Sequence, residues 1–153
     1  MENSLGNILK GRLVIVGMGN PLRGDDGLGP KLIEELSGKT GALCIDVGTS
    51  PESYGGKVLN AKPETILLVD AVHLGKSPGE YAILKKDEIA ESGVTTHNIS
   101  PKLFIEYLAA QSEAKIYLLG IQPKNTGFGQ TLSPEVEKTL KTIKQLIMEV
   151  LNA

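Results

Sequence analysis

The sequence contains a single cysteine among 153 residues, and this scarcity excludes several classes of site. One cysteine cannot form an internal disulfide or supply a metal site that needs two thiolates. Cys44 lies in the apolar segment Ala-Leu-Cys-Ile at 42–45, which is typical of a buried strand. Because burial raises the pKa of a thiol, we expect Cys44 to behave as a small hydrophobic side chain and not as a nucleophile.

The sequence also lacks long apolar runs and an excess of basic charge. Residues 1–12 contain no apolar stretch suited to a signal peptide, and no later run approaches the ~20 apolar residues of a membrane span. Sixteen basic and 18 acidic residues are interspersed, with a net charge of −2, so no broad positive surface is expected for nucleic acid. We expect a cytoplasmic protein that is a monomer by default and has neither a membrane nor a nucleic acid as partner.

The composition that is present suits one globular domain. Hydrophobic residues make up 41% and charged residues 22%, which is ordinary for a protein with its own core. We predict a single domain over residues 1–153, with 1–12 as a candidate N-terminal extension.

Short apolar runs alternate with helical periodicity along the chain. Five segments are expected to be strands: 13–16, 43–45, 66–69, 80–84 and 116–119. Residues 28–36 have helical spacing, and Ser-Pro pairs at 100–101 and 133–134 predict two further helix starts. Residues 58–61 fit either type of element. The alternation predicts an α/β fold, a three-layer αβα sandwich with a mostly parallel sheet of about five strands.

Two of the expected helices have an apolar face. After residue 101, Leu103, Tyr107 and Leu108 share one face. In the last helix the corresponding stripe consists of Val136, Leu140, Ile143, Ile147 and Val150. We expect both faces to pack on the core and not to form binding grooves.

Polar residues that carry chemistry follow the expected strands. In parallel sheets the loops at the carboxyl ends of strands gather functional groups, so Asp26, Asp46, Asp70 and His97 could meet in one crevice. Two carboxylates and an imidazole suit a divalent transition ion with open coordination positions. The alternative stays open that the aspartates cap helices and that His97 bonds to nearby backbone. We expect His73 to be an exposed loop histidine. The alternatives are that it binds the metal itself or that it donates a hydrogen bond to a metal ligand.

The loop at 17–27 is rich in glycine and begins with Gly-x-Gly after a strand, a pattern that invites a dinucleotide-binding interpretation. Leu22 stands where that motif has its third glycine, and two aspartates at 25–26 would repel a pyrophosphate. A carboxylate-bearing metal or peptide site fits this loop better.

Four separated motifs resemble those of the hydrogenase maturation endopeptidases. They are Gly-Met-Gly-Asn at 17–20 with Asp-Asp-Gly at 25–27, Asp-Val-Gly-Thr at 46–49, Val-Asp-Ala at 69–71, and Thr-His-Asn at 96–98. Their order and intervals are similar to the family's, and they extend over nearly the whole chain. The pattern at 95–98 and in the Pro21 loop looks most like the subgroup acting on formate-hydrogenlyase, or hydrogenase 3, type enzymes.

The resemblance implies an endopeptidase that removes the C-terminal extension of a nickel-iron hydrogenase large-subunit precursor after nickel insertion. It implies that Asp26, Asp70 and His97 are the three metal-binding residues and that the precursor supplies the nickel. Asp26 and Asp70 are the candidate catalytic residues, either beside the metal or as an acid-base pair. Some members of the family have glutamate in place of Asp26, and the glutamate side chain is one methylene longer. The shorter aspartate implies that the loop here approaches the metal more closely.

The resemblance also implies that Asp46, Gly48 and Thr49 contact the substrate. Two other functions remain as alternatives. The loop at 17–21 also resembles the opening of peptidyl-tRNA hydrolases, but that family's early histidine loop is missing, since no histidine precedes His73. A nickel-binding chaperone module would use the same three ligands without cutting a substrate.

Overall fold

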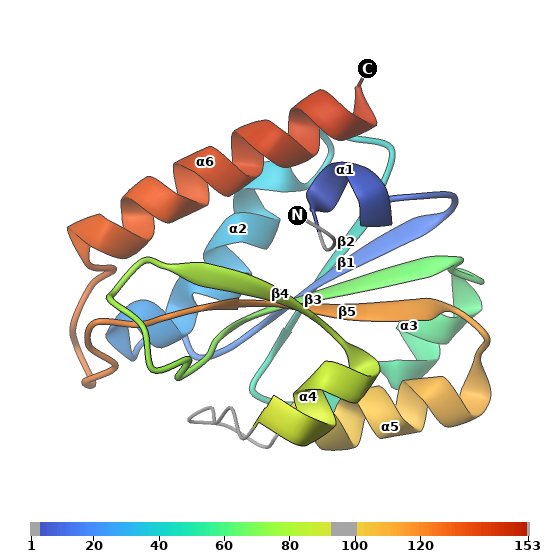
Figure 1. Cartoon of the computed structure of the whole chain (residues 1–153), viewed down its shortest axis with the longest axis horizontal. Coiled ribbons are helices and arrows are strands. Elements are labelled where there is room, and N and C mark those ends of the chain that lie inside the picture. The colour runs from blue at the N-terminus through green and yellow to red at the C-terminus, as the bar shows by residue number, and fades with distance from the viewer. Residues whose placement is uncertain (1–3, 93–100, 153) are drawn as a thin grey trace.

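The computed structural model describes residues 4–92 and 101–152, whose strands form one mostly parallel sheet (Figure 1). Its five strands are β1 Leu13–Met18, β2 Leu43–Gly48, β3 Thr65–Ala71, β4 Tyr81–Lys85 and β5 Lys115–Ile121. Their order in the sheet is β2-β1-β3-β5-β4, and β4 alone among them runs antiparallel to its neighbour. The predicted strands and the predicted fold class are confirmed.

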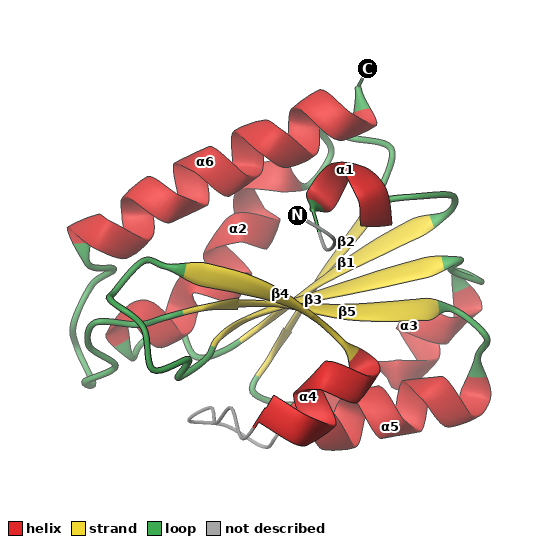
Figure 2. Cartoon of the chain, viewed as in Figure 1, coloured by secondary structure: helices red, strands yellow, loops and turns green. Residues whose placement is uncertain are grey.

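Helices cover both faces of the sheet and make the three layers visible in Figures 1 and 2. The helices are α1 Leu5–Ile8, α2 Leu28–Leu36, α3 Gly55–Asn60, α4 Lys86–Ser92, α5 Pro101–Gln111 and α6 Pro134–Leu151, with short 3₁₀ turns η1 Gly24–Gly27 and η2 Pro51–Ser53. One layer consists of α1, α2 and α6, and the other of α3, α4 and α5. Most of the ambiguous segment 58–61 is therefore helical.

Strand position decides how deeply each strand is buried. All residues of β1 and β3 are buried because helices cover both faces of the centre of the sheet. At the edge, β2 leaves Leu43 41% exposed and Cys44 half-buried, so the expectation of a buried strand at 42–45 is wrong for these two residues. The pKa of the Cys44 thiol is nevertheless raised by the partial burial, as predicted.

The apolar face of α6 packs on the core as predicted, with Val136, Leu140, Ile143 and Ile147 buried. Its N-terminus is capped by Ser133, whose Oγ accepts a hydrogen bond from the Val136 amide at 3.4 Å.

The prediction for α5 is wrong for two residues, since Leu103 is 60% exposed and Tyr107 46% exposed. The buried stripe of α5 consists instead of Phe104, Ile105 and Leu108, which pack against the sheet. Leu103 and Tyr107, four residues apart, occupy the neighbouring face of the helix. The hydroxyl of Ser100 lies outside the described residues.

The segment before β1 packs on the domain. Leu5 and Ile8 of α1 are buried in the same core cluster as α6, and Thr65 Oγ1 donates a 2.8 Å hydrogen bond to the Lys10 carbonyl. Within 4–92 and 101–152, no helix has both the length and the apolar character needed to traverse a bilayer.

The strand order produces a topological switch point at one end of the sheet. From β1 the chain passes through α2 to β2 on one side, and it returns through α3 on the opposite face to β3 on the other side. A sheet in the order 2-1-3 has its topological switch point between β1 and β3, and ligands bind outside the carboxyl ends of those strands. The loops after β1 and β3 carry Asp26 and Asp70.

The close approach of α2 to the sheet depends on Gly29. A Cβ added there would meet backbone atoms of Met18 and Val69, whereas one added at the helical Gly56 would meet nothing within 4 Å. Gly29→Ala should therefore lower the free energy of unfolding by about 2 kcal/mol through overpacking. Gly56→Ala should raise it by about 0.5 kcal/mol because alanine has less freedom in the unfolded chain. Urea unfolding measures both, and equal effects would contradict the close packing of α2.

Candidate functional site

The loop after β1 folds back on itself and buries η1. Gly19 has a φ of 136°, and a Cβ there would overlap the carbonyl oxygen of Asp26. The Asn20 amide donates a 2.9 Å hydrogen bond to Asp26 Oδ2, and Asn20 Oδ1 accepts one from the Leu22 amide at 2.9 Å. Glycine at position 19 therefore allows close packing of the chain against itself, which explains the Gly-x-Gly pattern without a phosphate ligand.

Two of the predicted site residues, Asp26 and Asp70, lie beside the switch point and are both 0% exposed. Asp70 lies near the carboxyl end of β3, where its Oδ1 accepts a 2.8 Å hydrogen bond from the Ala71 amide. Among the described residues, Asp70 Oδ2 has no hydrogen-bond partner. A buried carboxylate oxygen without a partner is costly, so the residue is placed at the expense of stability.

The two carboxyl groups interact electrostatically. Burial raises the pKa of Asp70 well above its ordinary value, the negative charge of Asp26 raises it further, and the hydrogen bond from the Ala71 amide partly opposes both. Pairs of carboxyl groups of this kind occur at acid-base and metal-binding sites.

Asp46 lies on the other face of the sheet. Its strand register places it opposite Gly17, and Gly17 is opposite Val69, so Asp46 is level with Val69 and shares its face. Because side chains alternate along a strand, Asp70 points to the opposite face. Asp46 is exposed, and its Oδ1 accepts a 2.9 Å hydrogen bond from the Gly48 amide. The neighbouring Thr49 is also exposed.

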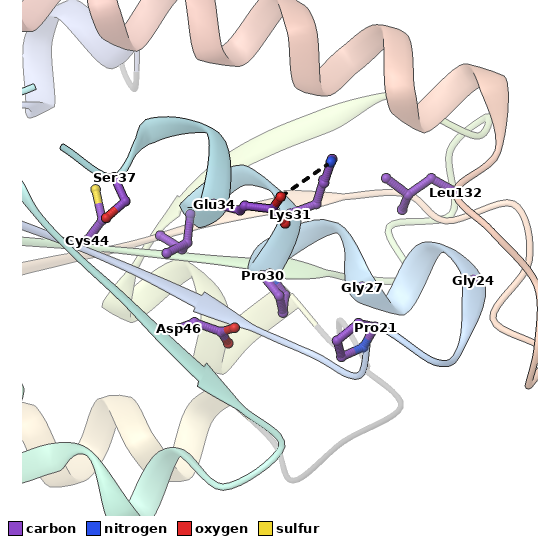
Figure 3. Close-up of a pocket in the computed structure, with 11 residues that line it drawn as sticks. Pro21, Gly24, Gly27, Pro30, Lys31, Glu34, Ser37, Cys44, Asp46 and Leu132 are labelled. Atoms are coloured by element: carbon purple, nitrogen blue, oxygen red, sulfur yellow. Dashed lines mark ion pairs between the residues drawn. The ribbon is translucent and has the colours of Figure 1, made fainter. Parts of the chain in front are cut away.

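A pocket of about 530 Å³ lies beside Asp46, between α2, β2 and the loop after β1 (Figure 3). Its lining includes Pro21, Gly27, Pro30 and Leu132 as well as Asp46. In Figure 3 the Asp46 carboxylate reaches toward Pro30 and Pro21 across this space. The sequence did not point to Pro30 and Leu132 as pocket residues. They lie more than a hundred residues apart, and no short sequence pattern indicates that both line the same pocket.

The structure describes one of the two histidines of the chain. His97 lies outside the described residues, and His73 is exposed after β3, as predicted. In the parts of the chain described, no three His, Cys, Asp or Glu side chains are grouped to hold a metal ion. These parts therefore contribute a pair of carboxylates, Asp26 and Asp70, and not a full ligand set.

Asp25 is a buried residue to which sequence reasoning assigned no role. It is 0% exposed, and its carboxylate accepts hydrogen bonds from residues near the start of α6. One of those partners, Ser133, is 108 residues away along the chain, and no local pattern in the sequence relates two such distant positions.

Comparison with known proteins gives consistent matches. A family model described as hydrogenase maturation protease matches residues 30–150. The chain is 34% identical over 135 residues to the hydrogenase 3 maturation protease of Escherichia coli K12, covering 86% of each protein. The crystal structure of the nickel-iron hydrogenase maturation protease HycI from Thermococcus kodakarensis has a TM-score of 0.87 and 33% identity, covering 97% of this chain and 99% of that one. The solution structure of the Escherichia coli endopeptidase HycI has a TM-score of 0.81 and 32% identity, covering 91% and 90%.

The raised pKa of Asp70 predicts a dependence of stability on pH. The folded state binds this proton more tightly than the unfolded chain, so the stabilisation is complete below the unfolded pKa and is lost as pH rises through the folded pKa. Asp70→Asn keeps the side chain neutral at every pH and should raise the free energy of unfolding at neutral pH. The gain should shrink as the pH falls toward about 3.9, the ordinary pKa of aspartate, and should vanish well below it, where Asp70 is protonated in both states.

Urea unfolding at several pH values measures this effect. Asp46→Asn, the same substitution at an exposed site, is the control and should change stability little. A loss of stability in Asp70→Asn at neutral pH would contradict an electrostatic penalty at Asp70.

Proposed function

The chain belongs to the hydrogenase maturation protease family, and from this premise we propose that it removes the C-terminal extension of a nickel-iron hydrogenase large-subunit precursor. Its role as an endopeptidase in hydrogenase processing follows from the family. Membership also decides against the peptidyl-tRNA hydrolase alternative. The similarity to a hydrogenase 3 maturation protease favours a precursor of the hydrogenase 3 type as the substrate.

The observation that carries this proposal is the buried carboxylate pair at the switch point of the sheet. Asp26 and Asp70 are both fully buried, and Asp70 keeps one oxygen without a partner among the described residues. Like charges held together in this way are unfavourable in the free protein, and a cation bound between them would remove the repulsion. The energetic cost of the pair is therefore offset when a metal-bearing substrate arrives.

Nickel suits this site as part of the substrate. Carboxylate oxygens together with an imidazole nitrogen form a ligand set for a divalent transition ion, and they leave coordination positions for ligands that the precursor provides. A precursor without nickel would lack this binding term, so the site would select the nickel-loaded form. The protein needs no resident metal for such selection.

His97 is the proposed third ligand, and the arrangement of neighbouring helices supports it. The chain enters the segment 93–100 from α4 and leaves it into α5, and both helices cover the same face of the sheet. Leu68 of β3 packs with the buried residues of α5 on that face. Asp70 is two residues further along the same strand, so its side chain points to the same face. The two helices that flank this segment in the chain therefore cover the face toward which Asp70 points.

The substrate peptide is proposed to lie in the pocket beside Asp46. Its volume of about 530 Å³ is within the usual range for ligand pockets, and Gly27, next to Asp26, forms part of its lining. The exposed Asp46 and Thr49, with Gly48 between them, provide polar groups at the end of β2 for an extended chain. Peptide binding and nickel binding would then occupy opposite sides of the loop after β1.

Two chemical roles for the carboxylate pair make different demands on Asp70. As an acid-base pair, Asp26 would accept a proton from the attacking water and Asp70 would donate one to the leaving amine. The raised pKa of Asp70 suits this donor role. As nickel ligands, both groups must be deprotonated, so nickel-dependent binding should weaken as pH falls.

Cleavage of the purified precursor tests the proposed function directly. We expect the protein to release the C-terminal peptide from the nickel-loaded hydrogenase precursor, as followed by mass spectrometry, and to leave the nickel-free precursor intact. Asp26→Asn should abolish release because it removes one charge from the pair. If the protein binds the nickel-loaded precursor but releases no peptide, it acts as a nickel-binding module and the peptidase proposal fails.

A histidine substitution separates docking from catalysis, and the chain offers a matched control because His73 and His97 are its two histidines. If nickel serves only in docking, His97→Ala should raise KM by about tenfold or more, while kcat at saturating precursor stays close to normal. His73→Ala, at an exposed position, should change neither constant. A loss of kcat in His97→Ala with unchanged precursor binding would instead assign the ion a part in the chemistry.

A further inference from the structure

Asp25 and Asp26 are adjacent in the sequence and both fully buried, but they have different surroundings. The Asp26 side chain accepts a hydrogen bond from the Asn20 amide within its own loop, and its charge raises the pKa of Asp70. The Asp25 side chain points instead toward the segment between β5 and α6, where N–H and O–H groups of Lys124, Asn125 and Ser133 donate to it.

Four hydrogen bonds satisfy the Asp25 carboxylate. Oδ1 accepts from the Ser133 amide at 2.7 Å. Oδ2 accepts from the Ser133 hydroxyl at 2.8 Å, the Lys124 amide at 2.8 Å and the Asn125 amide at 3.2 Å. Bonds from several N–H and O–H groups to one ionised carboxylate are short and strong, so this residue fastens the two loops together.

Backbone hydrogen bonds continue the same junction on either side. The Asp25 amide donates to the Asn125 carbonyl at 2.8 Å, and the Gly24 amide donates to the Gln130 carbonyl at 3.1 Å. The Gly129 amide donates to the Leu22 carbonyl at 2.8 Å. The loop after β1 and the loop after β5 therefore form one hydrogen-bonded unit, with the buried Asp25 carboxylate at its centre.

This unit fixes the position of η1, which carries Asp26 and lies beside β3. Asp25 resists a displacement of η1 because η1 cannot shift without breaking bonds to residues 124, 125 and 133. Asp25 is thus bonded to the segment between β5 and α6, while its chain neighbour Asp26 lies beside Asp70.

We infer that Asp25 is a positioning residue, which holds Asp26 beside Asp70 by fastening the loop after β1 to the start of α6. The inference rests on the proposed function for its effect on turnover, but the placement of Asp26 can be measured without it. Ser133 connects Asp25 to α6. Its hydroxyl donates a hydrogen bond to Asp25 and accepts one from the Val136 amide as the N-cap of the helix.

The first test uses Asp25→Asn, which keeps the size of the side chain but places an NH₂ group among donors. Loss of acceptor bonds should let η1 shift, and a misplacement of about 1 Å is expected to lower kcat by about 100-fold while KM for the precursor changes little. Thr139→Val is the matched control, because it removes a different α6 bond, the 2.6 Å hydrogen bond from Thr139 Oγ1 to the Gly79 carbonyl. Both variants are compared at a temperature where circular dichroism finds them folded.

An exchange measurement reports on Asp26 independently of activity. The Asn20 amide donates to Asp26 Oδ2, so its hydrogen exchange should quicken in Asp25→Asn and stay unchanged in Thr139→Val. Unchanged Asn20 exchange and unchanged kcat in folded Asp25→Asn would overturn the inference. If the unmodified protein cleaves no precursor, the proposed function fails, and the Asn20 measurement still decides the positioning role.

A milder pair of variants covers the case in which Asp25→Asn does not fold. Ser133→Ala removes the hydroxyl donor and should lower kcat by about tenfold with faster Asn20 exchange. Ser133→Thr retains a hydroxyl that can both cap α6 and bond to Asp25, and it should restore both properties. Equal kcat and equal Asn20 exchange in the two Ser133 variants would count against a positioning role.

Discussion

Two fully buried carboxyl groups, Asp26 and Asp70, are held at one end of the sheet, where the charge of Asp26 adds to burial in raising the pKa of Asp70. Much of the surrounding structure keeps these two groups in place. Gly19 lets the loop after β1 close onto Asp26, Gly29 lets α2 approach β1 and β3, and Asp25 ties η1 to the start of α6. Such an arrangement costs stability in the free protein, which is common where a site is prepared for a charged partner.

The strand order places this pair at the topological switch point of the sheet. The chain runs from β1 through α2 on one face to β2, and it returns through α3 on the opposite face to β3. Strand alternation then separates the polar groups at this end, with Asp70 on one face and Asp46 with its pocket on the other. The proposed function assigns these two places different roles, the carboxyl pair for the precursor's metal and the pocket for its peptide.

Local patterns predicted most elements of the fold correctly. The apolar runs of β1, β3 and β5 and the Ser133 cap of α6 are signals contained within a few residues, and the structure has all of them. The errors fall where burial depends on neighbours. Cys44 was expected in a fully buried strand but lies on the edge strand β2, and Leu103 and Tyr107 lie outside the buried stripe of α5. Apolar spacing indicates a face but not whether another element covers it.

By itself, the sequence determined the alternation of strands and helices, the position of aspartates at strand ends and the motifs of the family, because each depends on residues close together in the chain. Only the tertiary structure decided which aspartates meet. The strand order brings Asp26 and Asp70 together. The register of β2 against β1 places the Asp46 side chain on the opposite face of the sheet from Asp70. Asp25 finds its partners 99 to 108 residues away. Contacts over such separations depend on how the whole chain packs, and no short pattern encodes them.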